Sequence, residues 1–481
     1  MIPGPSIQVC KGDYVVIDTV NLMSGQAMSI HWHGILQDGS QYYDGVPFVT
    51  QCPIVDGNSL RYHWYAENEG TQFWHSHHGS QRIDGHYGSI VIRTPNPFHR
   101  NLYNYDRMED VIVLSDWLHN PANGSITNSS LAIFKVQPGK RYRFRSINAC
   151  STVCPAEFSI EGHKLKLIAS DGADIDPTDV DSILSTAGER YDFVLQTYES
   201  IEKSWWILLP RPSYDEGFLG AEVLDYFTTL QETNKPKRVV GGIIASALKA
   251  RTYIDRETYS DFNNTEIKNA LAVNEDIRGK PDIQVVPFSL MALDDDKFWT
   301  SNNYDLGGAL YHPLHLHAYQ YYFIGMGSNP NPVTCPDFNA TVFQILDKKG
   351  LIPRNYFNPS LKDSSTLTSR GYLILRLRAS NLGYWLLHCH FDYHMINGMQ
   401  MILHITHDGN TLHIFVRMIN NFIKALYKDA KKSITLLKER HKKVKAKKIF
   451  ELMPNGVSVR AIMVKGLAVA LRVRLKEQQL E

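Results

Sequence analysis

The sequence predicts an all-β chain of three successive β-sandwich domains, followed by a basic, helical C-terminal tail. Its 481 residues are too many for one hydrophobic core and enough for about three domains of ordinary size. Aromatic residues make up 11% of the chain, which suits strands better than helical bundles. Short β-rich runs recur between Gly, Pro, Asn and Asp residues, whereas helical periodicity is weak before residue 412.

The β-rich runs are spread along the body of the chain. Some alternate in period two and others are continuously apolar, as sandwich strands are. Loop-like stretches at 94–101 and at about 250–282 separate groups of runs. We therefore expect domains at residues 1–100, 101–260 and 261–410, and a tail at 411–481. The runs occupy residues 13–20, 89–95, 110–117, 141–148, 190–198 and 371–380.

The tail differs from the body in charge. From His413 onward it contains 17 Lys and Arg against 5 Asp and Glu, whereas residues 1–412 contain 33 against 44. Apolar residues from Phe415 to Leu426 fall at helical spacing, and a lysine-rich run occupies 438–448. This pattern predicts an amphipathic helix that ends in a solvated charge run. An arm that binds nucleic acid or an anionic membrane is the functional alternative.

Composition and the N-terminal residues exclude several classes. The sequence contains no apolar run of about 18 residues, so we expect no transmembrane helix. The first residues lack a charged region followed by an apolar one, so we expect no signal peptide in this chain. Six cysteines are too few for a disulfide scaffold in a chain of this length. Four N-x-S/T sequons favour a secreted glycoprotein, and their asparagines are Asn123, Asn128, Asn263 and Asn339.

Histidines two residues apart occur at four places. In a strand, residues i and i+2 point to the same face, so each His-x-His pair presents two imidazoles side by side. One such pair is ordinarily a surface or core feature, but four pairs among 20 histidines indicate a metal site. Eight neutral imidazoles without a second thiolate favour copper over structural zinc. The pairs are His31 and His33, His75 and His77, His315 and His317, and His388 and His390.

The last of these pairs encloses a cysteine. On a strand, Cys389 faces the opposite side from His388 and His390, so one segment can reach two metal sites. One cysteine, two histidines and a weak axial methionine form the blue-copper arrangement. The backbone around the cysteine would then join an electron-transfer copper to a histidine-lined cluster. The blue-copper set would be Cys389, His312, His394 and Met399.

Four segments together resemble the multicopper oxidases, and most closely the arthropod (insect-type) laccases. They read PGPSIQVC, IHWHGILQDGSQYYDGVPFVTQCPI, TQFWHSHHGSQRIDGHYGSIVIR and GYWLLHCHFDYHMINGM. The resemblance extends over about residues 3–405. It implies three cupredoxin-like Greek-key domains, with copper sites in the third domain and at the interface of the first and third.

The resemblance also implies four copper ions, one of type 1, one of type 2 and two of type 3. It assigns the type 1 ion to His312, Cys389 and His394, with Met399 as the axial ligand. It assigns the type 2 ion to His31 and His315. The type 3 pair would be held by His33, His75, His77, His317, His388 and His390.

Two carboxylates have roles implied by the resemblance. Glu161 matches an acid in the phenol pocket of related laccases, where a carboxylate can accept the phenolic proton; an exposed turn acid is the alternative. Asp44 matches an acid near the type 2 site that assists proton delivery to reduced oxygen; shaping an Asp-Gly turn is the alternative. We expect His78, directly after the second histidine pair, to be a bystander rather than a ligand.

The chain departs from the family pattern at both ends and in the third domain. It begins at what corresponds to the second strand of the first domain. Residues 294–313 are polar and loop-like where the family has an apolar strand, so we expect a shortened third domain. Ala318 replaces the usual glycine after the third histidine of the HPLHLH segment.

The cysteines other than Cys389 also depart from the pattern. In relatives, the counterpart of Cys52 pairs with a cysteine near the C-terminus, and the tail has none, so we expect Cys52 to lack that partner. Cys150 and Cys154 are disulfide candidates, and a bond from one of them to Cys10 is the alternative.

The leading functional interpretation is a copper-dependent oxidoreductase of the laccase type. It would take single electrons from phenolic or diphenolic small molecules and reduce dioxygen to water at the trinuclear cluster, with no protein nucleophile. A ferroxidase is an alternative that needs an acidic cluster beside His394 or His312, for which the candidates are Glu161 and Asp392. A truncated, non-catalytic copper-binding relative is a third interpretation, supported by the short third domain. We expect a monomer without a nucleic-acid partner, and an extracellular location by family resemblance.

Overall fold

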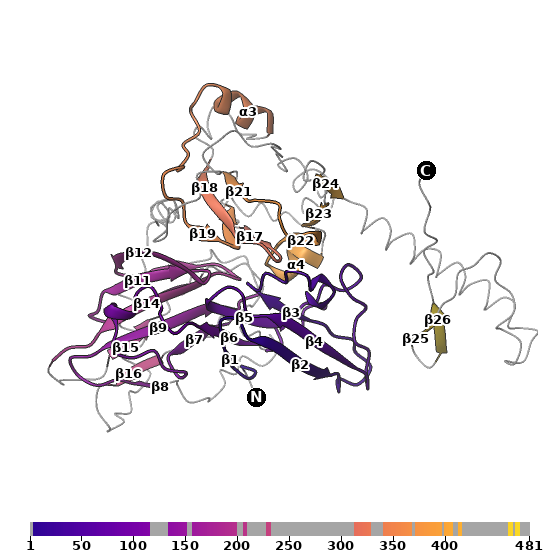
Figure 1. Cartoon of the computed structure of the whole chain (residues 1–481), viewed down its shortest axis with the longest axis horizontal. Helices are drawn as coiled ribbons and strands as arrows, with labels where there is room; N and C mark the ends of the chain where they lie inside the picture. Colours follow the sequence, from indigo (N-terminus) through magenta and orange to yellow (C-terminus); the bar gives the residue numbers. More distant parts are fainter. Residues whose placement is uncertain are drawn as a thin grey trace, which may run out of the picture. The chain divides into compact units, whose positions relative to one another are not determined.

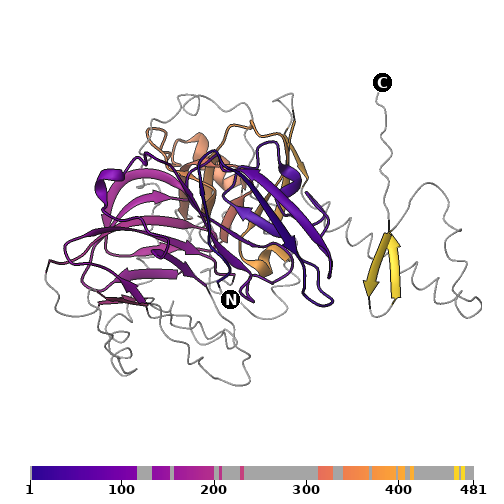
Figure 2. The same cartoon turned by 60° about the horizontal axis from the view of Figure 1, so that its bottom comes forward.

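Three pairs of β-sheets form the first of two compact units, which spans Met1–Val416 (Figure 1). In the second unit, Arg417–Glu481, the structure describes the hairpin of β25 (Arg460–Val464) and β26 (Leu467–Leu471), yellow in Figure 2. The predicted all-β fold class is confirmed. The computed structural model describes residues 3–115, 133–151, 156–199, 205–208, 228–231, 312–328, 340–367, 371–396, 399–406, 412–415, 460–464 and 467–471.

The first sheet pair lies within residues 3–97. Its four-stranded sheet has the order β1-β6-β5-β3, with β1 parallel to β6, and its second sheet pairs β2 with β4. Trp32 from one sheet and Tyr62 and Trp64 from the other are buried in one core, because alternate residues of each strand point inward. The strands are β1 (Ile7–Cys10), β2 (Tyr14–Val20), β3 (Ile30–His33), β4 (Ser59–Tyr65), β5 (Gly70–Ser76) and β6 (Tyr87–Arg93).

A short 3-10 turn, η2 (Arg100–Leu102), precedes the second sheet pair, and another, η1 (Gln41–Tyr43), lies between β3 and β4. The sheets of the second pair have the orders β12-β11-β14-β9-β7 and β13-β10-β15-β16-β8. Phe144 and Phe193 from the first sheet pack with Phe158 from the second. The strands are β7 (Val111–Leu114), β8 (Ile133–Lys135), β9 (Arg141–Asn148), β10 (Ala156–Ile160), β11 (Leu165–Ser170), β12 (Ala173–Val180), β13 (Ile183–Ser185), β14 (Arg190–Gln196), β15 (Trp205–Leu208) and β16 (Thr228–Gln231).

The third sheet pair carries two helices and the cysteine segment. Its sheets have the orders β20-β17-β22-β23-β24 and β19-β18-β21, and Trp385 and Tyr321 are buried between them. It forms an apolar core of its own, although most of the polar stretch 294–313 lies outside the described residues. The elements are β17 (His312–Leu316), β18 (Tyr321–Ser328), α3 (Ala340–Lys348), β19 (Leu361–Lys362), β20 (Ser364–Leu367), β21 (Gly371–Arg376), β22 (Gly383–Cys389), α4 (Asp392–Ile396), β23 (Gln400–Ile405) and β24 (Leu412–Phe415).

The expected tail helix does not begin at residue 413. Residues Leu412–Phe415 form β24, which pairs antiparallel with Ile402–Ile405 of β23. The edge of β23 presents backbone donors and acceptors that a neighbouring strand satisfies. The remainder of the expected helix, the boundary at 250–282 and the four sequon asparagines lie outside the described residues. Within the described part of the chain, no helix is long and apolar enough to cross a membrane.

The backbone conformation of Ala318 explains why glycine is the usual residue of the family at this position. Its φ of 57° lies in the left-handed region, which glycine adopts without steric cost and other residues adopt rarely. The alanine methyl packs in the core of the third sheet pair and is 5% exposed. This burial offsets part of the conformational strain immediately after His317.

Gly45 allows the loop that carries Asp44 to approach β3. Its φ is 89°, and a Cβ there would lie 1.9 Å from the carbonyl oxygen of Ile30. We expect Gly45→Ala to lower the free energy of unfolding by roughly 2–4 kcal/mol, because neither backbone segment can move without disturbing the buried strand. Gly57→Ala, at φ of 74° with nothing within 4 Å, should cost about 1 kcal/mol. Urea unfolding measures both, and equal losses would contradict the role of the close approach.

Candidate metal centre

Strand register brings the four histidine pairs together. His31 on β3 lies directly opposite His75 on β5, and His315 on β17 lies directly opposite His388 on β22. The two histidine-bearing strand pairs belong to different sheet pairs, and they meet where His31 Nε2 lies 3.3 Å from His315 Nε2. The cluster therefore forms only when the first and third sheet pairs are in contact.

The eight imidazoles form one buried cluster with three sets of facing ring nitrogens. In each set, two nitrogen atoms approach within 3.0–3.3 Å. Two of the sets extend to triads whose donor atoms all lie within 4.8 Å of one another. The triads are His33, His75 and His390, and His77, His317 and His388; the remaining pair is His31 and His315.

Outer ring nitrogens of the cluster are bound to protein oxygen atoms. His75 Nδ1 donates to the Ser76 carbonyl at 2.8 Å, and His388 Nδ1 donates to the Cys389 carbonyl at 2.9 Å. The inner nitrogens then carry lone pairs, and those of His75 and His77 have no hydrogen-bond partner among the described residues. Buried lone pairs that face one another repel unless a cation lies between them, so the donor set fits copper ions. The same pattern holds for His31, His315 and His317, which donate to Asp44 or Asp363.

Burial keeps most of these imidazoles neutral. It is the main cause that lowers the pKa of His33, His75, His77, His388 and His390 well below 6.5, and neighbouring imidazoles lower the pKa further. The pKa of His317 falls to about 3 for the same reasons. These rings are therefore unprotonated at neutral pH, which is the form that binds a metal ion.

The cysteine group forms on the other face of β22. Cys389 Sγ lies 3.5 Å from His394 Nδ1 and 3.9 Å from His312 Nδ1, and the two ring nitrogens are 3.2 Å apart. β22 ends at the cysteine, and the short helix α4 presents His394. Burial raises the pKa of the Cys389 thiol to about 12 and lowers the pKa of His312 to about 3 and of His394 to about 4.

Met399 lies beside this group. Its carbonyl accepts a hydrogen bond from the Cys389 N–H at 2.9 Å, and its N–H donates to the His394 carbonyl at 2.9 Å. Its side chain packs in the apolar cluster that contains Cys389, Leu314 and Phe391. The structure therefore brings together all four members of the predicted blue-copper set, in apolar surroundings.

Asp44 is fully buried next to the histidine cluster. Its Oδ2 accepts a hydrogen bond from His317 Nδ1 at 2.8 Å, and its backbone carbonyl accepts one from His31 Nδ1 at 2.8 Å. Oδ1 lies 3.2 Å from the same His31 nitrogen but accepts no hydrogen bond from any described residue. Burial alone would raise the pKa of Asp44, but its electrostatic interactions and hydrogen bonds with His317 and His31 outweigh it and lower the pKa.

Glu161 and His78 are not part of the donor groups found among the described residues. Glu161 lies in the turn after β10, half-buried, where its backbone carbonyl bonds His163 Nδ1 at 2.9 Å. His78 is half-buried next to the cluster strand β5. Cys10 and Cys52 are exposed and form no disulfide with any described residue. Cys154 lies outside the described residues, so its pairing with the buried Cys150 stays a prediction.

Buried charged residues around the cluster were missed by sequence reasoning. The Asp363 carboxylate lies 3.2 Å from His33 Nε2, and its backbone carbonyl accepts a hydrogen bond from His315 Nδ1 at 3.0 Å. Burial raises the pKa of this carboxyl, but the guanidinium of Arg190 beside it lowers the pKa more. A signal was present in GERYDFVL (188–195), because charges inside an apolar strand must be paired.

Arg82 is a second buried cation that the sequence analysis did not identify. It lies in the loop between β5 and β6 and contacts the ring and the backbone carbonyl of His390. It also donates to Asp392 Oδ1 at 2.5 Å and to Ser151 Oγ at 2.9 Å. The guanidinium thus connects the first sheet pair to the segment that follows Cys389.

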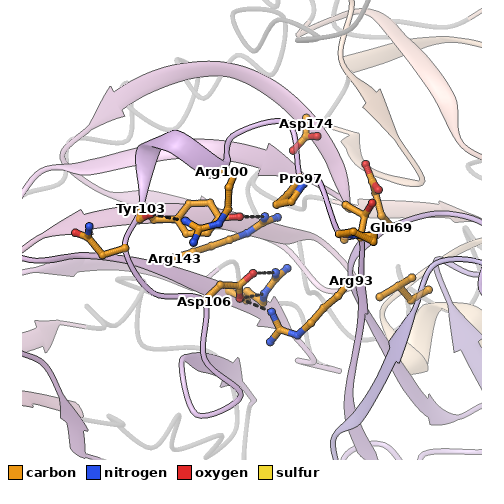
Figure 3. A pocket seen from close by; sticks show the side chains of 15 residues that line it. Glu69, Arg93, Pro97, Arg100, Tyr103, Asp106, Arg143 and Asp174 are labelled. Carbon is orange, nitrogen blue, oxygen red and sulfur yellow. Dashed lines mark hydrogen bonds and ion pairs between the residues drawn. The ribbon is translucent and has the colours of Figure 1, made fainter.

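A polar cavity of about 280 Å³ lies between residues of the first and second sheet pairs (Figure 3). Asp106 accepts from Arg93 at 2.8 Å and from Arg145 at 2.7 Å, so its single negative charge is shared by two of the lining arginines. Burial raises the pKa of Asp174, at the cavity edge, to about 6. None of the residues that line this cavity belongs to the histidine cluster or the cysteine group.

Comparisons of the sequence with family models and with known proteins all indicate the same protein family. Family models described as multicopper oxidase match residues 1–97, 64–226 and 254–408. Laccase-2 of Pleurotus ostreatus is 30% identical over 451 residues, covering 83% of this chain and 81% of that protein. Laccase-5 of Trametes villosa is 28% identical over 475 residues, covering 84% of each.

Solved structures show the same fold. The laccase from Botrytis aclada aligns with a TM-score of 0.65 at 23% identity, covering 86% of this chain and 84% of that one. Fet3p, described as a multicopper oxidase that functions in iron import, aligns with a TM-score of 0.59 at 20% identity, covering 86% and 88%.

We expect the metal-free chain to lose stability steeply as the pH falls below 6.5. His312 and His317 take up protons near pH 6.5 when unfolded but only near pH 3 when folded, so the unfolded state binds more protons between these values. Each of these two rings then lowers the free energy of unfolding by about 1.4 kcal/mol for each pH unit. Urea unfolding at a series of pH values measures the slope, and His317→Gln should make it shallower. A flat profile down to about pH 4 would contradict the burial of neutral rings.

Proposed function

Because the chain belongs to the multicopper oxidase family, we propose that it is a laccase-like oxidase of phenols or diphenols that reduces dioxygen to water. Family membership makes the chain a copper-dependent oxidoreductase. The observation that carries the proposal is the assembly of ten histidines, all buried except the half-buried His312, and one cysteine into donor groups on the two faces of one strand segment. The fungal relatives named above are laccases, which supports the phenolic substrate class.

Four copper ions would occupy the donor groups. Bound copper would supply the one-electron redox chemistry and the dioxygen reduction, which side chains alone do not provide. His31 and His315 would hold the type 2 ion, and the two histidine triads would hold the type 3 pair. Their facing inner nitrogens support this assignment. The type 1 ligands would be His312, Cys389 and His394, with Met399 axial.

The HCH segment would connect the two kinds of site. Cys389 belongs to the cysteine group, whereas His388 and His390 belong to different histidine triads. One peptide unit on either side of the cysteine therefore gives a continuous covalent path from the thiolate to each triad. All three residues are buried, so water is excluded along the path.

Asp44 would assist proton delivery to reduced oxygen. Its Oδ2 is engaged by His317, whereas Oδ1 accepts no hydrogen bond from a described residue. A proton would therefore pass through Asp44 at Oδ1, which faces His31, and the lowered pKa of Asp44 favours its onward release. We also propose Glu161 as the acid of the phenol pocket, and this role is supported by the sequence resemblance alone.

Several finer features are part of the same proposal. A separate hydrophobic core in each sheet pair supports the division into domains at 1–100, 101–260 and 261–410, with a tail at 411–481. The proposal of the arthropod (insect-type) subgroup rests only on the four segments quoted in the sequence analysis, whereas the relatives named above are fungal. A monomeric, extracellular glycoprotein is proposed from the family resemblance.

The copper(II)-loaded chain should show an intense blue thiolate-to-copper absorption band. Cys389→Ser should abolish the band, because no other described cysteine lies beside two histidines. His78→Ala is the matched control, since this half-buried histidine belongs to no donor group, and it should keep the band unchanged. A wild-type chain that binds copper without the band would favour a non-catalytic copper-binding relative.

A ferroxidase is disfavoured by the surroundings of Asp392, the acid nearest His394 in sequence. Its carboxylate is buried and paired with Arg82 at 2.5 Å, so it is not an exposed acid available to iron(II). We therefore expect kcat/KM for a catechol to exceed that for iron(II) by at least about 10-fold. Steady-state oxygen uptake with each substrate measures the ratio. A ratio below one would identify a ferroxidase.

A further inference from the structure

We infer that Arg190 is a positioning residue of the histidine cluster. Its buried guanidinium holds the Asp363 carboxylate, and Asp363 in turn orients the rings of His33 and His315. The same guanidinium contacts all three sheet pairs, so it ties formation of the cluster to their assembly. The inference deepens the proposed copper-oxidase function and rests on it.

All three guanidinium nitrogens of Arg190 donate hydrogen bonds to protein oxygen atoms. It makes a two-pronged contact with Asp363, in which each distance is 2.5 Å. Its Nε donates to the Thr71 carbonyl on β5 at 3.2 Å, and one terminal nitrogen donates to the Gly188 carbonyl at 2.9 Å. The other terminal nitrogen also contacts the Gln72 amide oxygen. The planar fork of arginine matches such a set, and a lysine ammonium does not.

Asp363 determines which nitrogen of His33 faces the cluster. Asp363 Oδ1 and Ser364 Oγ lie 3.2 Å and 3.1 Å from His33 Nε2, which leaves His33 Nδ1 facing His390 Nε2 at 3.0 Å. Inward-facing Nε2 atoms are found instead in His31, His315, His317, His388 and His390. The ring orientation of His33 therefore depends on the carboxylate that Arg190 holds.

Asp363 and Ser364 also support the ring of His315. The Asp363 carbonyl and Ser364 Oγ lie 3.0 Å and 3.2 Å from His315 Nδ1. His33 and His315 are stacked, with ring centroids 3.6 Å apart and planes 15° apart. Displacement of the Asp363 carboxylate would therefore release His33 directly and would disturb the stacked ring of His315 through it. Partners that orient ligand histidines typically contribute 10–100-fold to metal affinity.

Asp171 holds the backbone of this region through backbone N–H groups, and its Oδ1 also lies 3.6 Å from the Arg190 guanidinium. Its Oδ1 accepts from the Arg190 N–H at 2.9 Å, and its Oδ2 accepts from the N–H groups of Asp363 and Ser364 at 3.2 Å and 3.1 Å. Lys362 Nζ lies 3.1 Å from the same Oδ2. Loss of the Arg190 side chain should therefore release the Asp363 carboxylate while its backbone stays in place.

Arg145 provides a matched control. It is as deeply buried as Arg190 and also connects sheet pairs, with contacts to Thr71 Oγ1 at 2.7 Å and to Asp192 at 2.9 Å. Arg145 also pairs with Asp106 at 2.7 Å, and none of these three partners bonds a cluster histidine. A purely structural role for buried arginines predicts the same outcome for both positions, whereas the positioning role separates them.

The test compares the full-length wild-type chain with Arg190→Gln, Arg190→Lys and Arg145→Gln. Each protein is loaded with copper(II) and equilibrated with increasing concentrations of a competing chelator. Copper per chain, the blue band and the melting temperature are then measured. We expect Arg190→Gln to keep the blue band but to lose the remaining copper at 10–100-fold lower chelator concentration. Arg190→Lys should resemble Arg190→Gln, and Arg145→Gln should retain copper as the wild type does even where its melting temperature falls.

Two outcomes would overturn the positioning role. In the first, Arg190→Gln retains copper as the wild type does. In the second, the blue band and the remaining copper are lost together in Arg190→Gln and Arg145→Gln, in proportion to their melting temperatures. A wild-type chain that takes up no copper beyond the blue site would instead refute the proposed function itself, and the inference with it.

Discussion

The burial of eight imidazoles with their lone pairs directed at one another is the constraint on which the structure depends. Each of two sheet pairs supplies half of the rings, so neither can satisfy the arrangement alone. Inner nitrogens that face each other at 3.0–3.3 Å require a cation, and outer nitrogens require acceptors. Backbone carbonyls, Asp44 and Asp363 supply those acceptors.

Buried acceptors impose a second requirement, because carboxylates removed from water need compensating cations. Arg190 and Lys362 meet it around Asp363 and Asp171, and both cations are fully buried. This explains why β14 begins with an arginine in a strand that is otherwise suited to an apolar core. The polar network is thus a consequence of the histidine cluster, and it extends into the second sheet pair, whose described residues contribute no histidine to the cluster.

The cysteine group lies in a contrasting environment. Leu314 and Phe391 surround Cys389, and burial raises the thiol pKa to about 12. A metal ion bound there must displace the thiol proton, and the apolar packing limits water access to the sulfur. Because side chains alternate along the chain here, Cys389 points toward the apolar cysteine group, whereas its neighbours His388 and His390 point toward the polar histidine cluster. The two donor groups are thereby joined by one peptide unit on either side of Cys389.

The sequence by itself determined the strand-rich fold class, the histidine pairs and the opposite orientation of Cys389, because these follow from the period of two within single strands. The resemblance to the multicopper oxidases also pointed to Asp44, which lies beside the cluster. Only the tertiary structure decided which imidazoles face each other, that Leu412–Phe415 forms an edge strand, and that Arg190 and Asp363 support the cluster. Those features depend on contacts between residues far apart in the chain, and such contacts leave no periodic signal in the sequence.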